Sequence, residues 1–277
     1  MSTLQSIILG FIQGVTEFLP ISSSGHLLIA QSLFGITNDN LAISIVLHFG
    51  TFLAIIAAYP TSVWNLIKEF FGILFDLIRF KGLNLQKSKY RHYLIYIIIA
   101  SIPAAIVGVL LNDFIESVFS KVFIVSMTLF LTGFILLLGE RISANNQKEI
   151  QQLGLGKSFL VGLFQMVAIL PGISRSGTTM VGGLVCGLKK EEALEFSFLL
   201  ALPAILGSML LEMKSIVTML ADISVIPVVC GFLTALIVGY FSIKLFNLIV
   251  KKGHLVYFSI YCWTVGLILA VNMSYFN

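Results

Sequence analysis

The feature that most constrains the fold is a polar stretch enclosed by strongly apolar sequence. Residues 170–179 read Leu-Pro-Gly-Ile-Ser-Arg-Ser-Gly-Thr-Thr and carry one guanidinium, four hydroxyls, two glycines and a proline. Hydrocarbon tolerates irregular, polar backbone only where it is buried in protein or lines a wet cavity. An arginine there is costly, so Arg175 marks a candidate functional site. A Pro-Gly break followed by a Ser/Thr-rich helix start favours binding of an anion, and we expect phosphate.

The composition of the whole chain is typical of a polytopic membrane protein. Of its 277 residues 58% are hydrophobic and only 11% are charged, whereas soluble domains have about 25% charged residues. We therefore expect one membrane domain over residues 1–277, without a separate soluble domain. The net charge of +4 requires no nucleic-acid partner, because basic loops account for it. The three cysteines are far apart and are expected to be small buried hydrophobes.

Two pairs of short apolar arms predict two re-entrant hairpins. Residues 4–14 and 27–36 flank the polar segment 16–26, and each arm is shorter than the ~20 apolar residues that a spanning helix needs. We predict one hairpin over residues 1–36 and a second over residues 158–188.

The remaining apolar segments predict spanning helices. We expect an all-α fold with six transmembrane helices plus the two hairpins, and an interfacial amphipathic helix at residues 63–79. The six spans are predicted at 41–60, 93–111, 122–140, 193–212, 225–249 and 255–275.

Basic residues gather on alternate loops of this topology. They occupy loops 61–92, 141–157 and 188–192 and follow the fifth span, whereas the opposite loops hold only Lys121 and Lys214. The positive-inside rule places the first group in the cytoplasm and both termini outside. The two hairpins then enter from opposite faces, so we expect their tips to meet within the membrane.

An internal repeat points to the same arrangement. A shift of the first hairpin along the chain superposes Gln13 on Gln165, and it also superposes Ser22 on Ser174, Ser24 on Ser176 and Gly25 on Gly177. Halves that enter from opposite faces are typical of inverted-topology repeats, with a site at their interface near the midplane. We predict the two repeats at residues 1–140 and 158–277.

The hairpin tips carry groups suited to phosphoryl transfer. Such a reaction needs positive charge on the phosphate oxygens and an aligned attacking oxygen. Arg175 and the backbone N–H groups after Gly172 suit the first role. Ser23, or a water activated by His26 or Glu17, suits the second.

Each of these groups also has a purely structural interpretation. Glu17 could neutralise Arg175, a common role of intramembrane charges, and serines often cap helices or bond between them. His26 could be a hydrogen-bonded core histidine, although three neighbouring serines favour function. His48 lies in the first predicted span, and we expect it to be a satisfied core histidine.

Residues 17–26 and 171–177 resemble the two sequence motifs of the undecaprenyl-diphosphate phosphatase family, also called bacitracin-resistance proteins. The resemblance extends to length, span number and motif order. The family's first motif often begins Glu-x-x-x-Glu; here Gln13 replaces the first acid and Glu17 is retained. The resemblance implies hydrolysis of the C55 lipid carrier diphosphate to the monophosphate, which recycles the carrier for cell-wall synthesis.

The resemblance also implies cofactors, partners and site residues. It implies a divalent cation, Mg²⁺ or Ca²⁺, and a homodimer in the bacterial inner membrane, with a site open to the extracytoplasmic side. Carried over by motif position, the catalytic residues are Glu17, Ser23, His26 and Arg175, with Glu17 also the candidate metal ligand. The substrate-binding residues implied are Gln13, Ser22, Ser24, Gly172, Ser174, Ser176, Gly177 and Thr178.

These residues predict a mechanism with open alternatives. Ser23, assisted by His26, attacks the terminal phosphorus, or His26 activates a water instead; Glu17 binds the metal or polarises the histidine. A transporter or flippase of the polyprenyl phosphate carrier is the main rival, because broken helices in inverted repeats are a transporter architecture. An acid-phosphatase-like lipid phosphatase would need a histidine soon after Ser174-Arg175, which the sequence lacks. An arginine at the tip argues against a cation channel.

Overall fold

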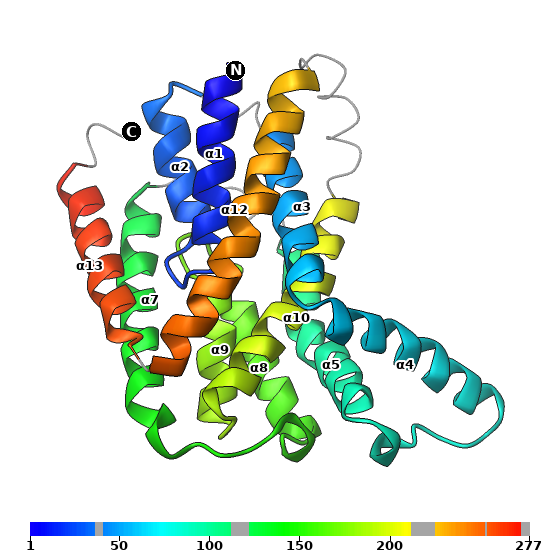
Figure 1. The fold of residues 1–277 in the computed structure, drawn as a ribbon. Coiled ribbons are helices and arrows are strands. Elements are labelled where there is room, and N and C mark those ends of the chain that lie inside the picture. Colours follow the sequence, from blue (N-terminus) through cyan, green and yellow to red (C-terminus); the bar gives the residue numbers. More distant parts are fainter. Residues whose placement is uncertain (37–40, 112–121, 212–224, 253, 273–277) are drawn as a thin grey trace.

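The computed structural model is a bundle of α-helices (Figure 1). It describes residues 1–36, 41–111, 122–211, 225–252 and 254–272. Within them lie one isolated parallel bridge, between Lys148 and Leu188, and no strand. The α-helices are α1 (Thr3–Thr16), α2 (Ser23–Leu33), α3 (Leu41–Ala58), α4 (Pro60–Ile78), α5 (Lys89–Leu110), α7 (Val122–Ile142), α8 (Leu155–Val167), α9 (Arg175–Val185), α10 (Lys190–Leu211), α12 (Val225–Lys252) and α13 (Val256–Val271). Short 3₁₀ turns are η2 (Leu85–Lys87), η3 (Ser143–Asn145) and η4 (Ile150–Gln152).

The helices identify a polytopic membrane protein. By length and composition four of the described helices, α5, α7, α10 and α12, can cross a membrane, and α3 with α4 would be a fifth span if that bent pair counts as one. Helix α13 is a shorter apolar helix, and the end of its predicted span, residues 273–275, lies outside the described residues. The predicted total of six spans therefore stays a prediction.

Both predicted hairpins consist of two short helices joined by a polar turn. Helices α1 and α2 form the first, and α8 and α9 form the second, in the opposite half of the bundle (Figure 1). In the second turn Gly172 has a φ of +87°, and a Cβ atom there would overlap the Thr128 hydroxyl of α7. Only glycine fits that conformation and that space.

Small residues let the hairpin arms pack closely on long helices. A Cβ atom on Gly14 of α1 would lie 2.9 Å from the backbone nitrogen of Gly239 in α12, and one on Gly162 of α8 would lie 2.7 Å from the carbonyl oxygen of Ala100 in α5. Close backbone approach at small residues is a common way to pack membrane helices. Each hairpin is thereby fixed to a long helix that lies far from it in sequence.

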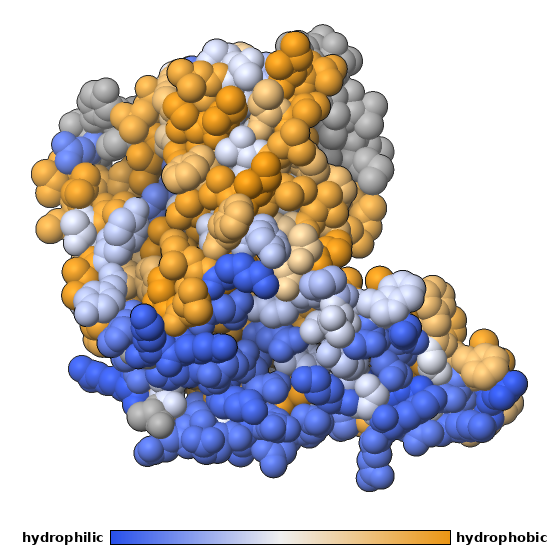
Figure 2. Space-filling model, viewed as in Figure 1, coloured by the Kyte–Doolittle hydropathy of each residue, from blue (hydrophilic) through white to orange (hydrophobic). Residues whose placement is uncertain are grey.

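The amphipathic helix predicted at 63–79 is α4. It begins at Pro60, bends by 92° from α3 and projects from the bundle (Figure 1). Arg91 at the start of α5 fastens it, with its guanidinium 2.6 Å from Glu69 and 2.7 Å from Asp76. Figure 2 shows hydrophobic side chains on the upper side of this projection and hydrophilic ones beneath. That pattern is typical of a helix lying at a membrane surface.

The surface divides into two zones. Figure 2 shows a largely hydrophobic upper body and a hydrophilic lower face, where the α4–α5 and α7–α8 connections lie. The described residues at the two chain ends lie toward the opposite, upper side (Figure 1). The division follows the basic loops that the sequence pattern placed together.

Candidate active site

Two helix N-termini, one from each hairpin, form the centre of the site. Helix α2 starts at Ser23, where the Ser22 hydroxyl accepts a hydrogen bond from the Gly25 N–H at 3.3 Å. Helix α9 starts at Arg175, and the Ser174 hydroxyl accepts from the Gly177 N–H at 3.2 Å. Both follow from the same Ser-x-x-Gly pattern, in which the serine caps the helix. The remaining N–H groups of each first turn favour a nearby anion.

The first residues of these two helices contact one carboxylate. Arg175 forms an ion pair with Oε1 of Glu17, and the Ser23 hydroxyl donates a hydrogen bond to Oε2 at 2.5 Å. Glu17 is only 8% exposed. The pairing of Glu17 with Arg175, and the meeting of the two tips, agree with the sequence prediction.

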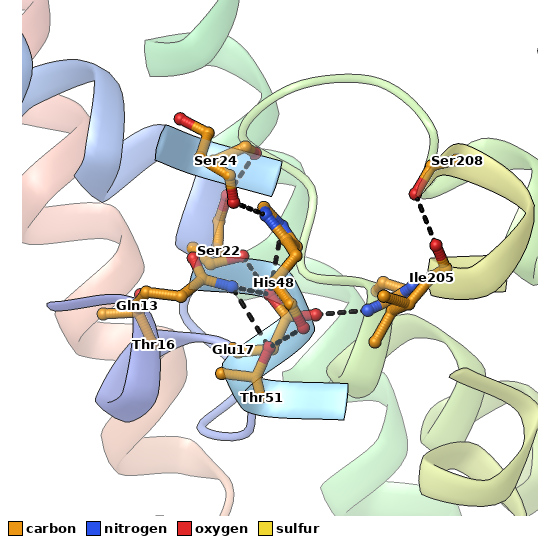
Figure 3. Close-up of polar contacts among 12 residues, drawn as sticks. Gln13, Thr16, Glu17, Ser22, Ser24, His48, Thr51, Ile205 and Ser208 are labelled. Carbon is orange, nitrogen blue, oxygen red and sulfur yellow. Dashed lines mark hydrogen bonds and ion pairs between the residues drawn. The ribbon is translucent and has the colours of Figure 1, made fainter. Parts of the chain in front are cut away.

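Three further side chains surround the same carboxylate (Figure 3). The Gln13 amide donates to Oε2 of Glu17 at 3.1 Å and to the Thr51 hydroxyl at 3.5 Å. Nε2 of His48 lies 3.7 Å from Oε2 of Glu17, and its Nδ1 lies 2.7 Å from the Ser44 carbonyl oxygen. We expected His48 to be a satisfied core histidine: the ring is hydrogen-bonded, but its core position was wrong, because the side chain is about 30% exposed and faces the cavity.

Direct contacts between the hairpins hold the two halves of the site together. The Gly172 N–H donates to the Ser24 hydroxyl at 3.2 Å. A Cβ atom on Gly177 would lie 2.8 Å from Cβ of Pro20. The geometry of the site therefore depends on close packing of both turns.

The site opens into a cavity of about 660 Å³. Its polar floor is made by Glu17, Ser23, Ser24, Ser174 and Arg175, together with His48. Its apolar walls are residues of α5 and α10, together with Ala168, Ile169, Leu170 and Ile173 of the second hairpin turn. A cavity with a cationic, hydrogen-bonding floor and hydrocarbon walls suits an amphiphile with an anionic head.

His26 faces a different part of the molecule. Its Nδ1 contacts the Ser22 carbonyl oxygen and its Nε2 contacts the Tyr261 hydroxyl, both at 2.8 Å, and the two rings stack. It lines a second hollow of about 290 Å³ beside α13. The expected position beside Glu17 and Arg175 is therefore not found, because both ring nitrogens are engaged on the α13 side of α2.

The other predicted substrate-binding residues divide into two groups. Ser24 and Ser174 line the cavity. The rest lie outside its lining, where they cap helices, pack the turns or support Glu17, and direct phosphate contact by them stays a prediction: Gln13, Ser22, Gly172, Ser176, Gly177 and Thr178.

Sequence reasoning missed five polar residues of the cavity. Thr16 ends α1, and the other four line the cavity from helices that were treated as apolar arms or spans: His48, Ser101, Gln165 and Ser208. For Gln165 a signal existed, since the repeat superposes it on Gln13. For His48 and Ser101 the only signal is a polar residue within a strongly apolar segment.

Known proteins are similar in sequence to this chain over nearly its whole length. A family model described as "Bacitracin resistance protein BacA" matches residues 6–268. A protein of Alkaliphilus metalliredigens (strain QYMF) named undecaprenyl-diphosphatase is 39% identical over 271 residues, which cover 97% of this chain and 98% of the relative. Relatives with the same name from Methanobrevibacter smithii and Halothermothrix orenii are 41% identical over 272 residues and 39% identical over 277 residues. The match to the Methanobrevibacter smithii relative covers 97% of this chain and 97% of the relative. The match to the Halothermothrix orenii relative covers 100% of each.

Proposed function

Since the chain belongs to the BacA family of bacitracin resistance proteins, we infer that it is an undecaprenyl-diphosphatase. It hydrolyses undecaprenyl diphosphate to undecaprenyl phosphate and inorganic phosphate within a membrane, and so recycles the lipid carrier for cell-wall synthesis. The observation that carries the chemistry is the joint contact of Ser23 and Arg175 with Glu17 at the floor of an apolar-walled cavity.

The diphosphate binds at the two helix N-termini. Arg175 presents a planar, permanently charged donor group that matches phosphate oxygens. In the resting site its anionic partner is Glu17. An arriving phosphate competes for that guanidinium, and the exchange leaves Glu17 free to act as a base.

Ser23 supplies the nucleophile. Its hydroxyl already donates to Glu17 at 2.5 Å, within the reach that a general base needs. The Ser23 oxygen forms a bond to the terminal phosphorus, its proton moves to Glu17, and the bridging P–O bond breaks, releasing polyprenyl phosphate. Water then hydrolyses the phosphoserine. Direct attack by a water held between Ser23 and Glu17 is the alternative for the same residues.

His26 acts as a positioning residue in this proposal. Through its contact with the Ser22 carbonyl oxygen it braces the turn that precedes Ser23. Ser22 has a φ of +72°, an uncommon conformation for a residue other than glycine, so the turn needs support from its surroundings.

A divalent cation, Mg²⁺ or Ca²⁺, fits the site only together with the substrate. Among the described residues no group of three or more His, Cys, Asp or Glu side chains can hold a metal ion. Hard cations take oxygen ligands and are often held by one carboxylate plus substrate phosphates. Glu17 and the Ser23 hydroxyl would be the protein ligands. When bound, the cation would neutralise charge on the phosphate oxygens.

The orientation of the site and the repeat belong to this proposal as well. The positive-inside rule assigns the hydrophilic face to the cytoplasm, so the cavity opens on the extracytoplasmic side of a cell membrane. An inverted repeat over 1–140 and 158–277 is supported by mirrored packing, α1 on α12 and α8 on α5. The homodimer that the resemblance implies stays a prediction.

Release of inorganic phosphate from undecaprenyl diphosphate by the purified protein tests this function. We expect Ser23→Ala to lower turnover by about 100-fold or more. Ser208→Ala is the matched control, because this serine also lines the cavity but, among the described residues, its hydroxyl bonds only to the Ile205 carbonyl oxygen, at 2.9 Å (Figure 3). Transfer of lipid across vesicles without phosphate release would favour the transporter alternative, which no observation here favours.

A further inference from the structure

The walls of the cavity form a slot between α5 and α10. On the α5 side the lining residues are Ser101, Ala104, Ala105, Gly108 and Val109. On the α10 side the small residues are Ala204, Gly207 and Ser208, which follow Pro203. The slot begins at the polar floor and continues along the described ends of both helices.

Two glycines keep this slot wide. A Cβ atom built on Gly108 or on Gly207 would meet no atom within 4 Å among the described residues. Neither glycine has a positive φ, so neither is required by backbone conformation. By contrast, Gly162 is required for packing, because its Cβ would lie 2.7 Å from a carbonyl oxygen. Glycine destabilises a helix relative to alanine. Neither packing among the described residues nor backbone conformation requires glycine at these two positions, so their place beside one cavity suggests a functional reason.

The chemistry of the slot identifies its occupant. Apart from the hydroxyls of Ser101 and Ser208 the walls are hydrocarbon and carry no charge, so they disfavour a charged group, while the anion-binding floor at Arg175 fixes where a phosphate lies. The occupant must therefore be an apolar chain bonded directly to that phosphate. About 660 Å³ is in the range of a site for a drug-sized ligand, so the slot encloses the head and the first part of the tail, and the rest of a C55 chain lies in lipid.

We propose that the slot between α5 and α10 binds the first isoprene units of the substrate, and that Gly108 and Gly207 set its width. This inference rests on the proposed function, since it concerns the tail of that substrate. The rival path for the tail is the second hollow beside α13, which Phe11, Leu33 and Tyr261 line.

Chain-length profiles test the proposal. Phosphate release is measured with the purified full-length protein on isopentenyl (C5), farnesyl (C15) and undecaprenyl (C55) diphosphates. For the wild type we expect kcat/KM to rise from C5 to C15 and then to level off, because added units leave the slot. In Gly207→Leu and in Gly108→Leu the side chain fills the slot, and we expect the C15 and C55 values to fall about tenfold while C5 changes little.

Gly156→Leu is the matched control. Gly156 is also a helical glycine with nothing within 4 Å of an added Cβ, but it lies in the first turn of α8, outside the cavity. This variant should keep the wild-type profile. An unchanged profile in both slot variants would overturn the proposal. Leu33→Trp fills the second hollow beside α13, and a loss of the C15 preference in that variant, rather than in the slot variants, would also overturn it. Absence of phosphate release from every substrate by the wild type would instead reject the proposed function.

Discussion

Arg175 and Glu17 form an ion pair although 158 residues separate them in sequence. One comes from each hairpin, so the pair joins the two halves of the site. We expect Arg175→Ala to abolish phosphate release, with a loss of about 100-fold or more, because both the anion site and the partner of a buried carboxylate disappear. Arg175→Lys should recover only part, since a point charge cannot replace the planar fork.

A double variant separates the loss of phosphate binding from a loss of folding stability in that experiment. In Arg175→Ala with Glu17→Gln no buried charge is left unpaired, so thermal stability should recover while activity stays absent. Thermal unfolding in detergent and phosphate release, measured on the same samples, check this. Near-normal turnover in Arg175→Ala would remove the arginine from the mechanism.

His48 should matter for turnover, although sequence reasoning predicted only a packing role for it. Its Nε2 faces Oε2 of Glu17 at 3.7 Å, and its removal leaves that side of the carboxylate open to the cavity. We expect His48→Ala to lower kcat by about tenfold, because Glu17 and Ser23 lose part of their alignment. His92→Ala is the matched control: its Nδ1 also contacts the carbonyl oxygen four residues back, that of Ser88, but the ring lies outside the cavity. Equal kcat values in the two variants would contradict the prediction.

Tyr261 should influence the reaction through His26. Tyr261→Phe removes the hydroxyl that lies 2.8 Å from Nε2 of His26 but keeps the stacked ring. We expect kcat to fall by about three- to tenfold with KM unchanged, because the turn before Ser23 is loosened while the phosphate contacts remain. Tyr257→Phe, on the exposed part of the same helix, should have no effect. A higher KM with the same kcat would indicate instead that Tyr261 touches the lipid.

The helical architecture and the central ion pair could be predicted because they follow from strong local signals. A guanidinium and a carboxylate in short apolar arms have few acceptable partners other than each other. Pro60, which starts α4, and the Pro171-Gly172 break are likewise local signals that end or bend helices. Helix ends deviated by a few residues, as in α5, which begins at Lys89 rather than at residue 93.

The directions of the two histidines could not be predicted. His26 and His48 each contact the carbonyl oxygen four residues back, so their local geometry is similar. Only the rotation of α2 and α3 against their neighbours turns one ring toward Tyr261 and the other toward Glu17. That rotation depends on tertiary packing, such as that of α3 on α12, which is far away in sequence.

The attachment of α4 should depend on pH. The Arg91 guanidinium, 2.7 Å from the Asp76 carboxylate, holds the pKa of that carboxyl below its ordinary value of 3.8, and Lys87 contributes. A carboxyl group with a lowered pKa in the folded state stabilises that state above its unfolded pKa, and the stabilisation is lost as pH falls through the folded value. We expect α4 to stay attached at neutral pH and to loosen only below about pH 4.

Fluorescence of Trp64 on α4 reports this attachment in a Trp263→Phe background. Asp76→Asn should loosen α4 already at neutral pH and remove the acid-dependent change. Glu149→Gln is the control, since Glu149 pairs with Lys189 at 3.2 Å on an exposed surface away from α4. An acid transition that persists unchanged in Asp76→Asn would show that another group causes it.

The final prediction concerns the cation. Glu17 is the one carboxylate on the cavity floor among the described residues, and Arg175 and Ser23 already occupy it. A site with so few protein ligands binds Mg²⁺ or Ca²⁺ weakly without further oxygen donors. We therefore expect the protein alone to show little Ca²⁺ binding by calorimetry, and to bind it about tenfold or more tightly once methylene diphosphonate, a non-hydrolysable diphosphate, is present. The coupling is reciprocal, so chelation should weaken binding of the diphosphonate by the same factor.

Glu17→Gln should remove this coupling even where some diphosphonate still binds at Arg175. Glu195→Gln, at a carboxylate bonded to Ser62 outside the cavity, should retain it. Tight Ca²⁺ binding by the wild type without diphosphonate would mean that ligands other than Glu17 hold the ion.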